Sequence, residues 1–302
     1  MNNTLDCVQT AAHLPWAGLV DELALLLQDT SVNVPPRLVQ PLGSGASLFV
    51  MPAMDSRTAI TKLITFTPAN AGTGRPTIQG DVVVFDIATG QRRLVLDGPT
   101  VTARRTAAVS VLAAQRLARE PQGSLLIVGA GVQGKAHLEA FAAVLGTRQV
   151  MIASRSTKSA ELLAQHARAL GLQAHVVSDA NAALPSCPLA VTCTPANSIV
   201  LSAMPRCDAF ISAVGAFTPD MAELSPELCQ HLATEGTVWL DTVDAQHEAG
   251  DLLQAGLNLH AMTTLGDVVR QHTAKPAGPV LFKSCGWAGW DLAAARLALS
   301  QP

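Results

Sequence analysis

The sequence predicts an α/β protein built on a doubly wound parallel sheet, with a separate antiparallel or mixed sheet before it. Two observations support this prediction. From Ser124 onward, short uncharged apolar runs alternate with segments of helical spacing, which is typical of βαβ units. Between Arg37 and Leu96, short alternating runs are instead separated by turn residues, which favours hairpins.

The first part of the chain shows helices around these strands but no βαβ pattern. Leucines gather on one helical face of Leu14 to Gln28, and Gly98-Pro99-Thr100 opens a long helix that runs to about Arg119. The expected strands are Leu48–Met51, Thr58–Phe66, Asp81–Asp86 and Arg93–Leu96.

A glycine-rich turn dominates the second part. The apolar run Leu125–Val128 reads as a strand buried on both faces, and the helical segment Val132–Leu145 follows it. Between them stands G-x-G-x-x-G, in which Gly129 allows a tight turn, Gly131 lets a pyrophosphate approach and Gly134 lets the helix pack on the strand. The helix N-terminus directs unpaired N–H groups at that pyrophosphate. This context predicts a dinucleotide site and a Rossmann-type fold.

The alternation continues to the end of the chain. Further strands are expected at Gln149–Ala153, Gln173–Val177, Leu189–Cys193, Ala209–Ala213 and Thr237–Asp241. Further helices are expected at Ser159–Leu170, from Ser225-Pro226-Glu227 onward, and at Gly286–Leu299, which we expect to return to the first domain.

The residues after the strand Gln149–Ala153 indicate which dinucleotide binds. A carboxylate there would bind the 2′-hydroxyl of NAD, whereas a cation accommodates the 2′-phosphate of NADP. The chain reads Ser154-Arg155-Ser156-Thr157-Lys158, without an acidic residue. The same turn would cap the next helix through Ser156 or Thr157, and the two roles are compatible. We therefore predict NADPH as the cofactor, with NADH as the weaker alternative.

Composition limits the other partners. A chain of 302 residues with a net charge of −3 carries no basic stripe for nucleic acid. Residues 1–9 do not resemble a signal peptide, and no apolar run is long enough to cross a membrane. The six cysteines are scattered without C-x-x-C, and the eight histidines lack H-x-x-x-H. We expect no metal site, and free thiols in the cytoplasm.

Three cations of the first domain are candidates for binding a substrate carboxylate. Arg37 follows Pro35-Pro36, Lys62 lies inside an apolar strand, and Arg105 occupies the early turns of the long helix. A cation near a helix N-terminus is locally unfavourable unless an anion binds beside it. Each residue alone is better explained by a surface charge or a structural ion pair. Only their convergence would form a carboxylate site.

Several short stretches together form a specific combination. They are Lys62-Leu63-Ile64, Gly80–Asp86 with Thr89-Gly90, Arg105–Ala108, Val128–Gln133, Val191–Pro195, Leu265-Gly266-Asp267, and Phe282-Lys283-Ser284 with Asp291-Leu292-Ala293. Over nearly the whole chain, this combination resembles the ornithine cyclodeaminase/mu-crystallin family. The resemblance implies a homodimer with an α+β substrate-binding and dimerisation domain, residues 1–120 and 283–302. The NADP-binding Rossmann domain, residues 121–282, is inserted into it.

The resemblance also assigns site residues. It implies that Arg37, Lys62 and Arg105 bind the carboxylate of a small amino-acid-like substrate, with Lys62 and Arg105 catalytic. Met51 and Met54 either line this pocket or fill the core, and we include Met54 in the substrate site. The predicted cofactor residues are Gly129, Gly131, Val132, Gln133, Gly134, Ser154, Arg155, Ser156, Lys158, Thr194 and Val214.

One departure from the family pattern separates its two branches. After the strand that ends at Val214, the cyclodeaminases of this family have a motif that resembles G-x-D-x-P. Its aspartate handles the amine and the hydrolytic water. Here the chain reads Gly215-Ala216-Phe217-Thr218-Pro219, and a phenyl ring can neither accept a proton nor orient water. Phe217 would instead form an apolar wall for the substrate ring. The sequence is thus closer to the Δ1-pyrroline-2-carboxylate/Δ1-piperideine-2-carboxylate (ketimine) reductases.

We therefore expect NADPH-dependent reduction of the C=N bond of cyclic imino acids, giving L-proline or L-pipecolate. The proton would come from Lys62 or a bound water, unless the imine arrives protonated. The alternatives are an ornithine cyclodeaminase, an alanine-type amino-acid dehydrogenase, and a non-catalytic NADPH-dependent binding protein like mu-crystallin.

Overall fold

The computed structural model describes residues 4–70, 73–195 and 198–301, and the chain divides into two compact units. Unit 1 comprises Met1–Arg105 with Trp287–Pro302, and unit 2 comprises Thr106–Gly286. Both chain ends therefore contribute to unit 1. The helix α3 (Gly98–Leu117) begins in unit 1 and ends in unit 2. Within the described part of the chain, no helix is both long and apolar enough to span a membrane.

Unit 1 is a six-stranded sheet with the order β1-β6-β5-β4-β3-β2. Its pairs are antiparallel except for β1 with β6. The strands are β1 (Thr4–Leu5), β2 (Leu38–Gly43), β3 (Ala46–Met54), β4 (Thr58–Phe66), β5 (Ile78–Asp86) and β6 (Arg92–Asp97). Its helices are α1 (Cys7–Ala12), α2 (Trp16–Leu26) and α10 (Ala288–Ser300). The expected hairpin strands are confirmed, whereas β1 and β2 were not predicted.

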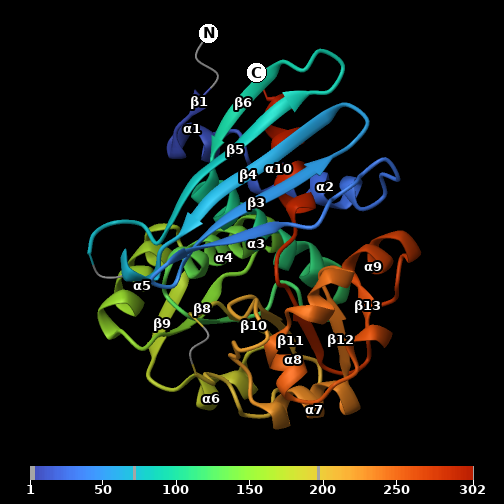
Figure 1. The fold of residues 1–302 in the computed structure, drawn as a ribbon. Coiled ribbons are helices and arrows are strands. Elements are labelled where there is room, and N and C mark those ends of the chain that lie inside the picture. The colour runs from blue at the N-terminus through green and yellow to red at the C-terminus, as the bar shows by residue number, and fades with distance from the viewer. Residues whose placement is uncertain (1–3, 71–72, 196–197, 302) are drawn as a thin grey trace. The chain divides into compact units, whose positions relative to one another are not determined.

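One face of this sheet is covered and the other is open. The C-terminal helix α10 packs along β3, β4 and β5, on the face that carries Ile60, Lys62 and Ile64 (Figure 1). The return of the last helix to the first domain is thus confirmed. On the opposite face, the register aligns Leu38, Val50 and Leu63 across three strands. Leu38 and Leu63 remain 57% and 45% exposed, which makes this row an apolar surface.

Unit 2 is an eight-stranded sheet with the order β13-β12-β14-β11-β10-β7-β8-β9, and all of its pairs are parallel. The strands are β7 (Leu125–Val128), β8 (Gln149–Ala153), β9 (Gln173–Val177), β10 (Leu189–Thr192), β11 (Phe210–Ala213), β12 (Thr237–Leu240), β13 (Thr263–Thr264) and β14 (Val280–Lys283). The helices are α4 (Val132–Ala140), α5 (Thr157–Ala169), α6 (Ala180–Ala183), α7 (Pro226–Glu235), α8 (Gly250–Gln254) and α9 (Leu265–Gln271). The predicted doubly wound parallel sheet is confirmed.

Several boundaries follow local chemistry. Gly146 adopts a left-handed conformation and ends the helical segment that begins at Val132, as predicted. Ser156 caps α5, which therefore begins at Thr157 and not at Ser159. The strand β14 was missed because it is four residues long and ends in Lys283, a charge that the sequence pattern does not place inside a sheet.

Candidate functional site

The order of the strands in unit 2 locates a ligand crevice. From β7 the chain continues through β8 to β9 on one side, whereas β10 and β11 lie on the other. The switch point of this doubly wound sheet is therefore between β7 and β10, where ligands bind beyond the carboxyl ends of the strands. The glycine-rich turn follows β7, Thr194 follows β10, and Val214 follows β11. Three segments that carry predicted cofactor residues thus reach the same edge of the sheet.

The glycine-rich turn has the shape that a dinucleotide needs. Gly129 has φ +117°, and a Cβ there would lie 2.8 Å from the carbonyl oxygen of Cys193. A Cβ on Gly134 would clash with the carbonyl oxygen of Gly129, whereas one on Gly131 would meet nothing within 4 Å. The outer glycines therefore allow close packing, and the middle one leaves space for a phosphate. Because no side chain caps α4 at Gly131, its first N–H groups suit an anion.

A cavity adjoins this turn. It has a volume of about 440 Å³ and is lined by Ala130, Gly131, Val132, Lys135, Ser159, Leu162, Leu163 and His166. Val132 is 72% exposed beside it, and the side chain of Gln133 is half-buried. The glycine-rich turn, the start of α4 and one side of α5 from its first to its last turn therefore line one cavity, and these residues fit a dinucleotide.

The turn after β8 combines a helix cap with exposed cations. The Ser156 hydroxyl accepts the backbone N–H of Ser159 at 3.2 Å, and Ser156 N–H donates to Ser154 Oγ at 3.4 Å. The predicted capping by Ser156 is therefore confirmed. Arg155 and Lys158 are exposed in this turn, and neither forms an ion pair among the described residues.

In unit 1, two of the three candidate cations meet at a buried carboxylate. Lys62 Nζ lies 2.7 Å from Asp291 Oδ2, and Arg105 Nε donates to Asp291 Oδ1 at 3.2 Å. Lys62 comes from β4, Arg105 from α3 and Asp291 from α10, and all three side chains are buried. The cluster holds two positive charges and one negative charge. A surplus of one buried positive charge therefore remains.

The proton affinity of Lys62 reflects this environment. Burial lowers the pKa of Lys62 to about 8, because water no longer stabilises its charged form. The carboxylate of Asp291 opposes this shift, whereas the charges of Arg105 and Arg37 add to it. The influence of Arg37 on this pKa indicates that it lies within electrostatic range of Lys62.

The strand register places the two methionines, for which the sequence left pocket lining and core filling open, on opposite faces of the sheet. Met51 is paired with Lys62, so both side chains lie on the face covered by α10, and Met51 is buried. Met54 is paired with Ala59 and lies on the opposite face of the sheet, because side chains alternate along a strand. The register thus brings Met51, and not Met54, to the buried cation cluster.

Phe217 lies in the loop after β11. Its side chain is half-buried and packs against the hydrophobic core of unit 2. Two further buried acids, Asp291 and Glu223, were not predicted as site residues. Asp291 is an isolated acid in an apolar run, and that isolation is the signal that could have identified it. Glu223 has Asp220 and Glu227 within four residues, so the sequence gives no such signal for it.

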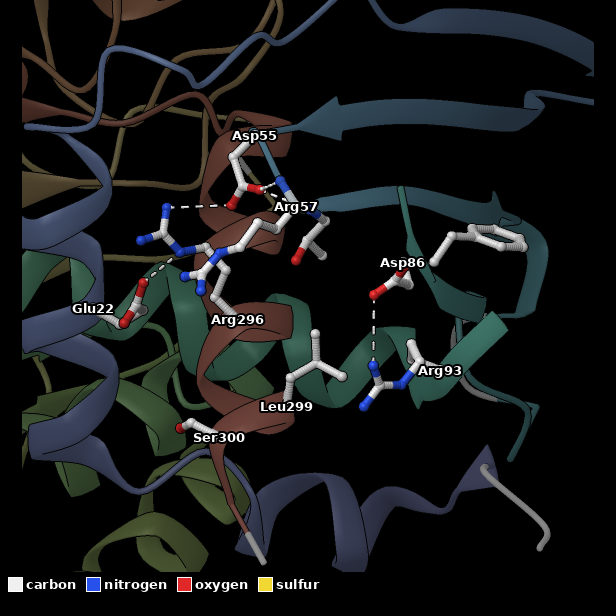
Figure 2. Close-up of a pocket in the computed structure, with 10 residues that line it drawn as sticks. Glu22, Asp55, Arg57, Asp86, Arg93, Arg296, Leu299 and Ser300 are labelled. Carbon is white, nitrogen blue, oxygen red and sulfur yellow. Dashed lines mark hydrogen bonds and ion pairs between the residues drawn. The ribbon is translucent and has the colours of Figure 1, made fainter. Parts of the chain in front are cut away.

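Another cavity lies in unit 1, and its lining is mostly charged. It has a volume of about 400 Å³, and Figure 2 shows charged side chains around it. Arg296 lies 2.7 Å from Glu22, 2.9 Å from Asp29 and 3.4 Å from Asp55, and Arg93 lies 3.7 Å from Asp86. Arg296 is therefore balanced by carboxylates of the protein itself, unlike the cations beside Asp291.

Known proteins resemble this chain over almost its full length. Residues 7–300 match the profile described as the ornithine cyclodeaminase/mu-crystallin family. The Δ1-pyrroline-2-carboxylate reductase 1 of Burkholderia multivorans is 38% identical over 297 residues, 97% of this chain and 94% of that protein. The Δ1-pyrroline-2-carboxylate/Δ1-piperideine-2-carboxylate reductase of Azospirillum brasilense is 36% identical over 301 residues, 97% and 94% of the two chains.

A solved structure shares the fold. The Δ1-pyrroline-2-carboxylate reductase of Thermococcus litoralis, solved with NADH and L-proline, superposes with a TM-score of 0.84 at 22% identity. The match covers 97% of this chain and 92% of that chain. At this identity, the comparison shows the fold alone.

Replacing Asp291 tests the buried cation cluster. We expect Asp291→Asn to lower the free energy of unfolding by about 3–5 kcal/mol, because it leaves Lys62 and Arg105 as uncompensated buried charges. Urea unfolding followed by tryptophan fluorescence measures this, since Trp16, Trp287 and Trp290 all lie in unit 1. The matched control is Glu161→Gln, which removes an exposed carboxylate 3.9 Å from Arg168 and should cost less than about 1 kcal/mol. Equal costs in the two variants would contradict the assignment.

Proposed function

Because the chain belongs to the ornithine cyclodeaminase/mu-crystallin family, we propose that it reduces the C=N bond of small cyclic imino acids with NADPH. The products are L-proline from Δ1-pyrroline-2-carboxylate and L-pipecolate from Δ1-piperideine-2-carboxylate. The observation that carries this proposal is the 38% identity, over 97% of the chain, to a reductase named for the first imine. The Azospirillum brasilense relative, named for both imines, supports the six-membered ring as a second substrate.

The buried cations bind the substrate carboxylate in this proposal. Arg105 contacts Asp291 through Nε, which leaves Nη1 and Nη2 to form a bidentate pair with a carboxylate. The surplus positive charge of Lys62, Arg105 and Asp291 is neutralised by that carboxylate, and the charge of Arg37 adds to the attraction. Asp291 itself holds both cations in place and does not contact substrate.

The chemistry then requires one hydride and one proton. A bound nicotinamide supplies the hydride to the imine carbon, and a proton on the imine nitrogen completes the amine. Lys62, with a pKa of about 8, keeps its proton at neutral pH and can donate it or hold it close to the nitrogen. As the pH rises through about 8, Lys62 loses its charge, and its attraction for the carboxylate falls.

The residue at position 217 supports reduction over ammonia elimination. A cyclodeaminase needs a carboxylate at the position of Phe217, and the phenyl ring provides neither a base nor a ligand for water. The buried acid that follows in the chain, Glu223, is no substitute. It is 0% exposed, and its two oxygens already accept hydrogen bonds from Thr192, Thr194 and Gly215.

The turn after β8 supports NADPH over NADH. Arg155 and Lys158 are exposed cations, and Ser154 and Ser156 add hydroxyl groups to the same turn. Such a set favours a 2′-phosphate, whereas the 2′-hydroxyl of NADH would leave the cations without a partner. The proposal places the reaction in the cytoplasm, a reducing compartment in which the six free cysteines stay reduced.

The open face of the six-stranded sheet supports a homodimer. Leu38, Val50 and Leu63 form an apolar row there, and Leu38 and Leu63 are about half exposed. A second copy of the chain would remove this row from water, which is favourable at about 25 cal/mol per Å² of apolar surface. We therefore place the dimer interface on this face.

The first test is turnover and its dependence on Arg105. Purified protein should oxidise NADPH, followed at 340 nm, in the presence of either cyclic imine. Arg105→Ala should raise the KM for the imine about 10- to 100-fold, because a bidentate charged pair contributes about 1.5–3 kcal/mol. No turnover with either ring would refute the proposal, and ammonia release from ornithine would point to a cyclodeaminase. Tight NADPH binding without hydride transfer would indicate a binding protein.

Arg155→Ala tests the choice of cofactor. The variant should weaken NADPH by about tenfold and leave NADH almost unchanged, because only NADPH has the 2′-phosphate. The KM values of the two cofactors at saturating imine measure this difference. An equal loss for both cofactors would show that Arg155 does not bind the 2′-phosphate.

Leu63→Glu tests the dimer interface. Leu63 is the end of the apolar row that lies on the central strand β4. A carboxylate there would be desolvated in the dimer, so the variant should be monomeric. Size-exclusion chromatography with light scattering measures the mass in solution. Leu170→Glu is the matched control, because Leu170 is 47% exposed but belongs to unit 2, and it should leave the mass unchanged. A Leu63→Glu protein that stays dimeric would exclude this face.

A further inference from the structure

Glu223 joins two loops of unit 2 through one carboxylate. The residue is 0% exposed, and it lies between β11 and α7. Its Oε1 accepts the backbone N–H of Thr194 at 2.6 Å and the Thr194 hydroxyl at 2.9 Å. Its Oε2 accepts the backbone N–H of Gly215 at 2.7 Å and the Thr192 hydroxyl at 2.9 Å. Oε1 thus binds Thr194 after β10, whereas Oε2 binds Gly215 after β11 together with Thr192 at the end of β10.

These loops lie at the carboxyl ends of two adjacent strands. Thr194 follows β10 and Gly215 follows β11, next to the switch point between β7 and β10. The glycine-rich turn after β7 receives the pyrophosphate, and the turn after β8 receives the adenosine side. The loops after β10 and β11 are therefore left for the nicotinamide half of a dinucleotide.

Only a carboxylate satisfies all four donors. Two of the donors are backbone N–H groups, which cannot rotate to become acceptors. One of them points at each oxygen of Glu223, so an amide at this position would turn its NH₂ group toward an N–H. Gly215 makes the close approach possible, because a Cβ there would clash with the Glu223 carboxyl and with the carbonyl oxygen of Thr194.

Glu223 is itself held in place by a second buried acid. Asp251 Oδ1 accepts the backbone N–H groups of Glu223 at 2.5 Å and of Leu224 at 2.9 Å. Its other oxygen accepts Lys283 Nζ at 2.5 Å, and both side chains are buried. Burial raises the pKa of Glu223, whereas the charge of Lys283 and the hydrogen bonds from Thr194 act to lower it. The carboxylate therefore has a fixed backbone and a nearby cation.

We propose that Glu223 is a positioning residue for the nicotinamide half of the cofactor site, because it holds Thr194 after β10 and Gly215 after β11 in one arrangement. Its carboxylate does not touch substrate in this proposal, because the residue is 0% exposed and four protein donors occupy its two oxygens. The proposal rests on the proposed function only in that a nicotinamide dinucleotide is the ligand. It predicts that loss of this carboxylate weakens the binding of the whole cofactor but not of its adenosine half.

Glu223→Gln tests this by calorimetry with two ligands. NADPH contains both halves, whereas adenosine 2′,5′-bisphosphate contains only the adenosine half. We expect the variant to bind NADPH about tenfold more weakly, because one loop donor faces the amide NH₂, and to bind the bisphosphate as the wild type does. Glu227→Gln is the matched control, because Glu227 lies four residues later, is exposed in the first turn of α7, and should leave both affinities unchanged.

Two outcomes would overturn the proposal: unchanged binding of NADPH by Glu223→Gln, or an equal loss for both ligands. Retained binding of the bisphosphate shows that the variant is folded. If Glu223→Gln does not fold, Thr192→Val decides, since it removes one hydroxyl donor and should weaken NADPH alone by about threefold. An unchanged NADPH affinity in Thr192→Val would then overturn it. The binding measurements contain no imine and therefore do not depend on the reductase activity. A wild-type protein that binds NADPH but does not reduce imines would refute the proposed reductase activity and leave the proposed role of Glu223 standing.

Discussion

The buried contact of Asp291 with Lys62 and Arg105 is the interaction on which the rest of unit 1 depends. It joins the last helix to a central strand and to the first turns of α3, across 186 residues of sequence in the case of Arg105. Two buried cations without a carboxylate would be strongly unfavourable, and a second carboxylate would remove the surplus charge. One acid between two cationic side chains therefore leaves a surplus positive charge while Lys62 is protonated.

In unit 2, the same requirement that buried polar groups have a partner concerns backbone N–H groups. At the switch point of the sheet, the first N–H groups of α4 follow the glycine-rich turn without a side-chain cap, and they suit an anion. The backbone N–H groups of Thr194 after β10 and Gly215 after β11 are instead bound by Glu223.

Local sequence patterns predicted the parallel sheet, its glycine-rich turn and most helix ends, because these features depend on neighbouring residues. Ser156 as a cap and Gly146 as a stop are examples. The patterns failed where contacts with a segment distant in the sequence determine the structure. The strand β14 lies between β11 and β12 and ends in Lys283, whose charge is acceptable only because Asp251 meets it. Met51 and Met54 could be separated only by the pairing of β3 with β4.

The sequence by itself determined the fold class, the position of the glycine-rich turn and, through its combination of motifs, the family. It could also name Lys62 and Arg105 as candidates, but a lone cation in a sequence has no visible partner. Only the tertiary structure decided that both share Asp291, and that Glu223 bridges two loops. The reason is physical: the free energy of a buried charge depends on what surrounds it in space, and those neighbours come from segments far apart in the chain.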